Sequence, residues 1–146
     1  MSANAETIRF LQSVPLFKDL DRQHQNVIAR TIFERSFQPG DVIVKEGETG
    51  LGVYMIREGK VEVVQGAGDK ERMLTTLRKG DVFGEIALLI DAPRTATVRA
   101  VEPTTCLVLT AWNFRAELQQ SASMANVLLK AVARRLADAD KRLAAQ

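Results

Sequence analysis

Closely spaced turn signals in the middle of this 146-residue chain constrain its fold more than any other feature. Between these signals lie short β-prone runs, the pattern of an antiparallel sandwich or barrel. Some runs alternate with period two, as Val61 and Val63 do around Glu62, which fits strands with one buried face. The turn signals are Pro39-Gly40-Asp41, Gly47 to Gly50, Glu58-Gly59, Gly66 to Asp69, Gly80-Asp81, Ala92-Pro93 and Glu102-Pro103.

The two ends of the chain have a helical pattern instead. Segments 5–13, 21–35 and 111–120 lack internal Gly and Pro and place apolar residues at helical spacing. Ser123 is the expected N-cap of a last helix that runs from about Met124 to the terminus. We therefore expect helices on both sides of a β core.

The length supports a single hydrophobic core, so we expect one domain over residues 1–146. Within it, N-terminal helices occupy residues 1–35, the β core occupies residues 36–110, and C-terminal helices occupy residues 111–146. The fold class that this order predicts is α+β.

The last helix carries an apolar stripe with alternating spacings of four and three residues. Such a stripe either packs on its own domain or forms the seam of a homodimer. Alanine at two stripe positions makes an isolated coiled coil weak. The stripe residues are Ala125, Leu129, Val132, Leu136, Ala139 and Leu143.

Charge and cysteine content narrow the class of protein. The 20 basic and 18 acidic residues are spread along the chain, which gives no electrostatic footprint for nucleic acid. The single cysteine, Cys106, cannot form an intramolecular disulfide, so we expect a cytoplasmic protein with a buried thiol on a strand. No apolar run approaches the roughly 20 residues that a membrane helix needs, so we expect no membrane insertion.

The single histidine, His24, lies in the N-terminal helical region. One histidine cannot build the histidine cluster of a cupin-type metal site, and no G-x-S-x-G elbow supports serine-histidine hydrolysis. We therefore expect no catalytic residues, no metal site and no cofactor.

Residues 83–98 hold the most informative constellation, FGEIALLIDAPRTATV. Gly84 lets a ligand approach the backbone, and one helical turn over residues 86–89 would direct free N–H groups toward a phosphate there. Arg94 offers a planar fork of donors to phosphate oxygens, and Glu85 can accept a hydrogen bond from a sugar hydroxyl. A sugar phosphate fits this arrangement.

This stretch resembles the phosphate-binding cassette of the cyclic-nucleotide-binding domain family, with the FGE, AL and PRxATV elements all present. The turns at 40–41 and 80–81 and the hairpin at 57–60 are also similar to that family. The resemblance implies a β-roll, a double-stranded antiparallel jelly-roll-like barrel, flanked by N-terminal helices and a long C-terminal helix. It extends to the sensor domains of the catabolite activator protein family and of cyclic-nucleotide-gated channels.

For the phosphate, the resemblance implies contacts from the start of the cassette and from its arginine. Gly84, Ile86 and Ala87 would bring backbone groups to the ribose phosphate. Arg94 would pair with the cyclic phosphate, and the N–H of Ala96 would add a donor.

For the sugar and base, the resemblance implies a second group of contacts. Glu85 would hold the ribose 2′-hydroxyl, and the hydroxyl of Thr95 would reach phosphate or the exocyclic amine of a syn guanine. Val63 and Leu74 would face the base from the strands. Arg135 is the candidate on the last helix to cap the base, because no aromatic residue lies between 115 and 146.

Together these features predict a receptor for a 3′,5′-cyclic nucleotide, with cAMP favoured and cGMP as the alternative. Binding should tighten the cassette and reposition the C-terminal helix. Two other interpretations stay open: a degenerate dimerisation scaffold, in which Glu85 and Arg94 form only a structural ion pair, or the sensor half of a transcription factor or channel.

Overall fold

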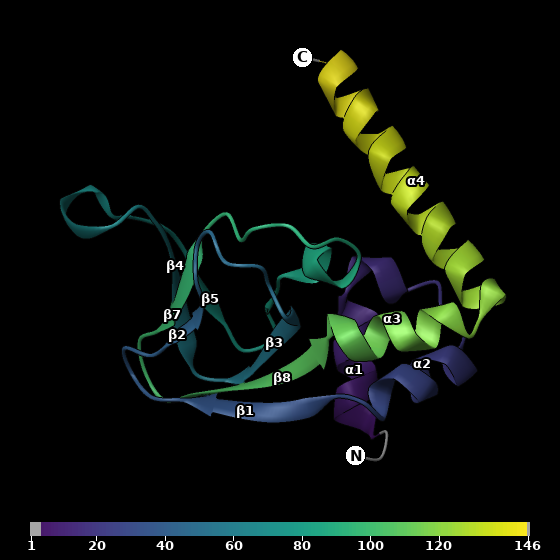
Figure 1. Ribbon diagram of the computed structural model, residues 1–146, viewed down its shortest axis with the longest axis horizontal. Coiled ribbons are helices and arrows are strands. Elements are labelled where there is room, and N and C mark those ends of the chain that lie inside the picture. The colour runs from purple at the N-terminus through teal and green to yellow at the C-terminus, as the bar shows by residue number, and fades with distance from the viewer. Residues whose placement is uncertain (1–3, 146) are drawn as a thin grey trace.

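The computed structural model describes residues 4–145, in which helices precede and follow a β region (Figure 1). Residues 1–3 and 146 of the expected domain lie outside the described residues. The helices, with 3-10 turns marked η, are α1 (Ala5–Ser13), η1 (Pro15–Phe17), α2 (Arg22–Ala29), η2 (Gly68–Lys70), η3 (Glu85–Leu88), α3 (Ala111–Gln119) and α4 (Ala122–Ala144). The strands are β1 (Phe33–Phe37), β2 (Val42–Val44), β3 (Gly52–Glu58), β4 (Lys60–Gln65), β5 (Arg72–Arg78), β6 (Val82–Phe83), β7 (Thr97–Ala100) and β8 (Thr104–Thr110).

The strands form two four-stranded antiparallel sheets, ordered β1-β8-β3-β6 and β2-β7-β4-β5. Apolar side chains from both sheets form one core, which includes Ile43, Ile56, Val61 and Val98. Two sheets that bury their facing sides in this way, with helices before and after them, confirm the expected α+β class and the β-roll.

A second core joins the helices to the first sheet. Phe10, Phe17 and Phe114 are fully buried there together with Leu109 of β8. The rings of Phe17 and Phe114 lie 5.2 Å apart, so the N-terminal helices and α3 pack as one unit. Fully burying a side chain of this size stabilises the fold by about 1.5–3 kcal/mol.

The predicted helix over residues 21–35 is wrong in its second half. Helix α2 begins after the Asp21 cap and ends at Ala29, and strand β1 begins at Phe33. Residues 33–37 pair along their whole length with β8, so the helical boundary expected at residue 35 lies too late. Pairing with a strand some 70 residues later in the chain overrides the local helical spacing.

Helix α4 starts two residues earlier than expected. Its N-cap is Ser121, not Ser123, because the Ser121 hydroxyl accepts the N–H of Met124 at 3.1 Å. The buried side of α4 consists of Met124, Leu128 and Ala131.

The heptad stripe on α4 does not cover the domain, so the interpretation that it packs on its own domain is wrong. Leu129, Leu136 and Leu143 are each about two-thirds exposed, because the buried face lies one position away from the stripe. The C-terminal part of α4 projects from the body of the molecule, as the yellow ribbon in Figure 1 shows.

Cys106 lies on β8 in the core between the sheets, as expected for a strand thiol. Burial raises the pKa of its thiol to about 11, so it stays protonated at neutral pH. None of the described helices combines the length and the apolar character that a membrane span requires.

Candidate functional site

The excursion between β6 and β7, residues 83–98, builds one wall of the candidate site, and we call it the cassette. Strand β6 ends at Phe83, and Gly84 follows in the left-handed region with φ of 89°. A side chain at that φ would be strained, so glycine allows the chain to turn directly into η3. The expected helical turn is present, but it is a 3-10 turn and starts at Glu85.

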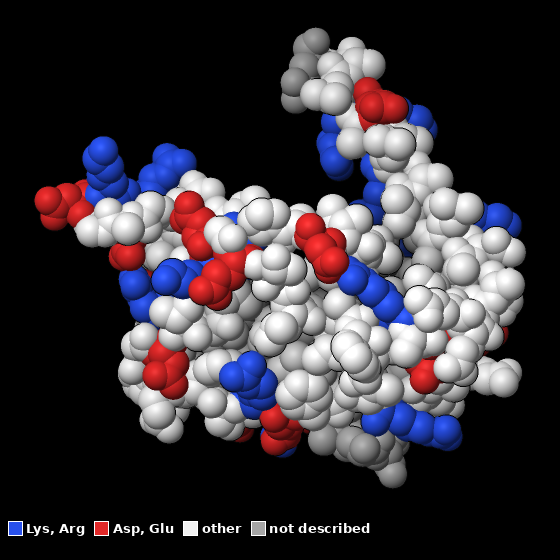
Figure 2. Space-filling view, viewed as in Figure 1, with Lys and Arg blue, Asp and Glu red and all other residues white. Residues whose placement is uncertain are grey.

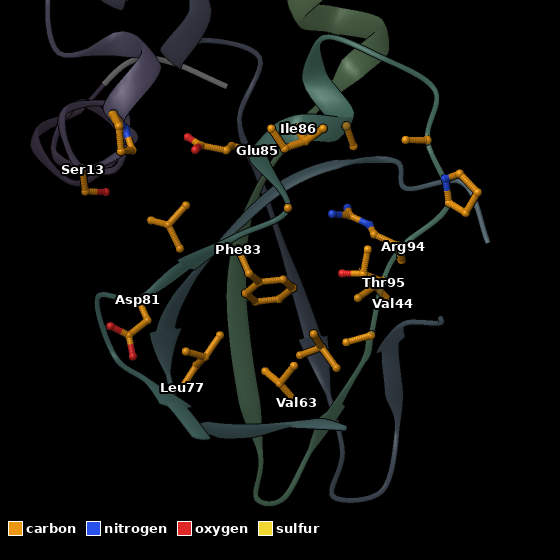
Figure 3. Close-up of a pocket in the computed structure, with 18 of the residues that line it drawn as sticks. Ser13, Val44, Val63, Leu77, Asp81, Phe83, Glu85, Ile86, Arg94 and Thr95 are labelled. Carbon is orange, nitrogen blue, oxygen red and sulfur yellow. The ribbon is translucent and has the colours of Figure 1, made fainter. Parts of the chain in front are cut away.

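A cavity of about 810 Å³ lies between the cassette and the β-roll (Figure 3). In the close-up, Arg94 and Thr95 lie on one side of the cavity, and Leu77 and Asp81 lie on the other. The lining residues that the sequence predicted are Val63, Gly84, Glu85, Ile86, Ala87, Arg94, Thr95 and Ala96. A volume of this size is ample for a small organic ligand.

Arg94 is held in place by loop backbone rather than by an acidic side chain. Its backbone N–H donates to the carbonyl of Glu48 at 2.9 Å, and Nη2 of its side chain donates to the carbonyl of Gly52 at 2.6 Å. The guanidinium fits between Gly50 and Gly84, because a Cβ atom added to either glycine would collide with it.

The same guanidinium keeps a spare donor. Its Nε is buried and has no partner among the described residues, and burial lowers the pKa of Arg94 from its usual value. No carboxylate of residues 4–145 forms an ion pair with it. A partly buried cation that lines a cavity and has an unpaired donor is suited to an anion.

Glu85 provides the complementary group. Its side chain is 17% exposed, and its Oε1 pairs with Nη1 of Arg135 on α4 at 2.5 Å. Its Oε2 is buried without a partner among the described residues. The Glu85–Arg94 ion pair of the scaffold interpretation is therefore not formed.

Two expected base contacts do not line the cavity. Arg135 is occupied by Glu85 and lies outside the lining, and Leu74 is 47% exposed. Thr75 pairs with Val63 and Met73 pairs with Val64, so Leu74 is the extra residue of a β-bulge. Leu77 pairs with Val61, two residues along from the Val63–Thr75 pair, so it shares the face of Val63 and lines the cavity.

The apolar wall of the cavity includes one ring of a stacked aromatic pair. Phe83 lines the cavity and stacks on Tyr54, with ring centroids 5.1 Å apart and planes 4° apart. Burial raises the pKa of the Tyr54 hydroxyl. Neither Phe83 nor Gly50 was predicted as a site residue from the sequence. Phe83 was interpreted only as part of the motif, and Gly50 only as a turn residue, although Gly50 and Gly84 together form the slot that holds the guanidinium of Arg94.

His24 lies away from this cavity. Its Nε2 is 3.4 Å from Oγ of Ser121 and 3.3 Å from Oγ of Ser123, at the start of α4. Among residues 4–145, no three His, Cys, Asp or Glu side chains are grouped in a way that could hold a metal ion. The cavity lining combines the cation of Arg94 and the carboxylates of Glu85 and Asp81 with the Thr95 hydroxyl and apolar side chains.

Comparison with protein families gives a match that covers the β-roll and the cassette. The family model described as "Cyclic nucleotide-binding domain" matches residues 34–121. A cGMP-dependent protein kinase from Eimeria tenella is 45% identical over 103 residues, which are 70% of this chain and 10% of the kinase. The matched segments span from 10% to 32% of the curated relatives, so those proteins are far longer than this chain.

Solved structures agree with this match. The N-terminal domain of a transcriptional regulator from Streptomyces coelicolor A3(2) is similar over 92% of this chain and 94% of that domain, with a TM-score of 0.80 and 31% identity. The regulatory domain of Toxoplasma gondii PKA with cAMP is similar over 76% of this chain and 43% of that one, with a TM-score of 0.68 and 29% identity.

Proposed function

The chain belongs to the cyclic nucleotide-binding domain family, and we propose that it binds a purine 3′,5′-cyclic nucleotide in the cavity beneath the cassette. The cyclic phosphate would lie against Arg94 and the backbone of Gly84 and Ala87, with the Ala96 N–H as a further donor. The base would lie on the apolar wall that includes Val63.

One observation carries this proposal. A buried donor without a partner, Nε of Arg94, and a buried acceptor without a partner, Oε2 of Glu85, belong to side chains that line the same cavity. Leaving such atoms unpaired costs about 1–3 kcal/mol each. A ribose cyclic phosphate supplies the complement of both, since its anionic oxygens accept from the guanidinium and its 2′-hydroxyl donates to the carboxylate.

The identity of the base is a separate step. We favour cAMP, as bound to the similar Toxoplasma gondii regulatory domain, and keep cGMP as the alternative. Two features support the alternative: the relative from Eimeria tenella is a cGMP-dependent kinase, and the Thr95 hydroxyl lies on the cavity wall where a syn guanine amine could reach it.

We propose that α4 reports occupancy of the site. The Glu85–Arg135 ion pair joins the ribose-binding carboxylate to α4, so a hydroxyl that engages Glu85 changes a contact of the helix. The exposed stripe of α4 supports the further proposal of a homodimer through this helix. The same stripe favours a ligand-free dimerisation scaffold as the second candidate function.

The domain would act as a sensor and not as an enzyme, with no cofactor and no direct contact to nucleic acid. Acidic and basic side chains are interspersed over the face in Figure 2, which suits a small ligand better than a phosphate backbone. We expect the cytoplasm as its compartment, since the free thiol of Cys106 is ordinary there. Its partner would be the rest of a transcription factor or channel, or a separate effector.

The test is isothermal titration of the nucleotide-stripped chain with cAMP and with cGMP, with 5′-AMP as the control ligand. We expect saturable binding of one cyclic nucleotide and at least tenfold weaker binding of 5′-AMP, whose phosphate is not tied back to the ribose. Absence of binding for both cyclic nucleotides would leave the dimerisation scaffold as the function.

A further inference from the structure

Arg115, on α3, directs its whole guanidinium at the cassette. Its Nε donates to the carbonyl of Leu88 at 3.0 Å, and its Nη2 donates to the carbonyl of Ala87 at 3.1 Å. Its Nη1 pairs with Oδ1 of Asp91 at 3.0 Å. Residues far apart in the sequence are therefore joined by three contacts from one side chain.

The two carbonyls lie at the C-terminal end of η3. Carbonyls at a helix end lack partners within the helix, and a cation there is also favoured by the local dipole. A guanidinium is a rigid planar fork, so it fixes two neighbouring carbonyls in one orientation, which a flexible ammonium does not. Asp91 contributes less, because its side chain is 73% exposed.

Apolar packing also holds η3 in place, independently of Arg115. Leu88 is fully buried in the helical core together with Phe114 and Leu128. The side chain of Leu88 thus belongs to the same buried cluster as residues of α3 and α4, while its carbonyl binds Arg115. Substitution of the arginine would remove the polar link and leave this packing in place.

From this geometry we propose that Arg115 is the positioning residue that transmits the state of the cassette to α3 and α4. The inference rests on the proposed function for its ligand. When a phosphate draws the cassette toward Arg94, the carbonyls of Ala87 and Leu88 move with it, and the guanidinium moves α3. Only residues 120–121 separate α3 from α4, so the displacement reaches the projecting helix.

The experiment measures a distance between two spin labels in the full 146-residue chain. The labels are attached at A137C on the exposed half of α4 and at D69C on the exposed tip of the β4–β5 hairpin. Cys106 can stay, because it is buried and its high pKa keeps it unreactive. The distance is recorded without nucleotide and with saturating cAMP or cGMP, and affinity is measured by titration.

Four variants separate the contacts. R115A removes all three, and R115K keeps the charge and the stem but loses the fork. D91N weakens only the ion pair. R134A is the matched control, because Arg134 also pairs with a carboxylate, that of Asp19, which lies outside the cassette.

We expect R115A and R115K to bind the nucleotide within about tenfold of the parent and to lose more than half of the ligand-induced distance change. D91N and R134A should keep the ligand-induced distance change of the parent. Hydrogen exchange of the ligand-free chain should show amides 84–91 opening about tenfold faster in R115A and R115K than in R134A.

A full distance change in both Arg115 variants would overturn the proposal. If the parent binds no cyclic nucleotide, the proposed function fails separately. Unaltered hydrogen exchange of amides 84–91 in R115K would then also overturn the proposal that Arg115 positions the cassette. R115K also decides the matter if R115A does not fold, since it keeps the volume of the stem.

Discussion

The cassette and the apolar stripe of α4 are both strong sequence patterns. In the structure the cassette residues come together around a cavity, whereas most of the stripe stays exposed. In the cassette, Glu85 and Arg94 line one cavity, and each has a buried polar atom without a partner among the described residues. On α4, the apolar stripe that includes Leu129 and Leu136 remains exposed.

The difference comes from what each pattern encodes. The cassette is 16 consecutive residues whose turn, short helix and arginine close on one another, so its chemistry is specified locally. A heptad stripe predicts only that an apolar helix face is buried against something. The partner can be the same domain, a second copy of the chain or another protein. Mutations in each region can show whether the cassette and α4 act independently of each other.

The largest effect should come from removing the charge that completes the cassette. We expect Arg94→Ala to weaken cyclic nucleotide binding by about 2–5 kcal/mol, because a partly desolvated phosphate would lose its charged partner. Titration calorimetry measures the change. Arg99→Ala is the matched control, since Arg99 lies on the adjacent strand and pairs with Glu62 and Glu71 outside the cavity.

Arg94→Lys sharpens the same test. It keeps a positive charge but cannot donate from a planar fork within the glycine slot, so its affinity should fall between that of the parent and that of Arg94→Ala. Equal affinity of Arg94→Ala and the parent would show that the phosphate is bound elsewhere and would remove the cassette side of the comparison.

Within α4, two leucines should differ sharply in stability. Leu128→Ala should lower the free energy of unfolding by about 2–4 kcal/mol, because Leu128 is 3% exposed in the helical core. Leu136→Ala should change it by less than about 0.5 kcal/mol at low protein concentration, because Leu136 is 64% exposed. Urea unfolding measures both values.

A dimer that forms through the stripe would reduce the difference in stability between Leu128→Ala and Leu136→Ala. Leu136→Ala would then destabilise the protein increasingly as protein concentration rises, and analytical ultracentrifugation would show a weaker dimer. A concentration-independent stability for both variants would leave the stripe uncovered in the isolated chain.

The sequence was sufficient where the constraint was local. The spacing of turns predicted the β core, and the cassette residues Gly84, Glu85 and Arg94 were found by their chemistry and by the family resemblance, and all of them line the cavity. The site roles assigned to them stay predictions until a ligand is bound.

The sequence was insufficient where distant strands or a single inserted residue decided the outcome. Residues 33–35, the first part of strand β1, were predicted as helix because the pairing of β1 with β8 cannot be seen in the local sequence. Leu74 was placed at the base by the family resemblance, whereas in the structure it is the unpaired residue of a bulge and is about half exposed, and Leu77 lines the cavity. Arg135 was assigned to the base, whereas in the structure it pairs with Glu85, a contact across 50 residues.

A smaller effect should follow from removing the carboxylate that links the two regions. Glu85→Ala should weaken binding of the ribonucleotide by about 1.5–3 kcal/mol, because a hydrogen bond to a charged group is lost. Binding of the 2′-deoxy analogue should change much less, since it has no hydroxyl to donate. Titration of both ligands against both proteins gives the difference, and equal losses would exclude Glu85 from the ribose contact.

The smallest effect should be on the choice of base. Thr95→Ala removes one hydroxyl from the cavity wall and should weaken cGMP by about 0.5–1.5 kcal/mol while leaving cAMP nearly unchanged. The 2-amino group of a syn guanine can donate a hydrogen bond to this hydroxyl, and adenine has no 2-amino group. Thr95→Ser keeps the hydroxyl and serves as the control for the lost methyl group. Parallel titrations with the two nucleotides measure the ratio of affinities. If Thr95→Ala weakens both ligands equally, the hydroxyl contacts the phosphate that they share, and discrimination between the bases must come from the apolar wall or from α4.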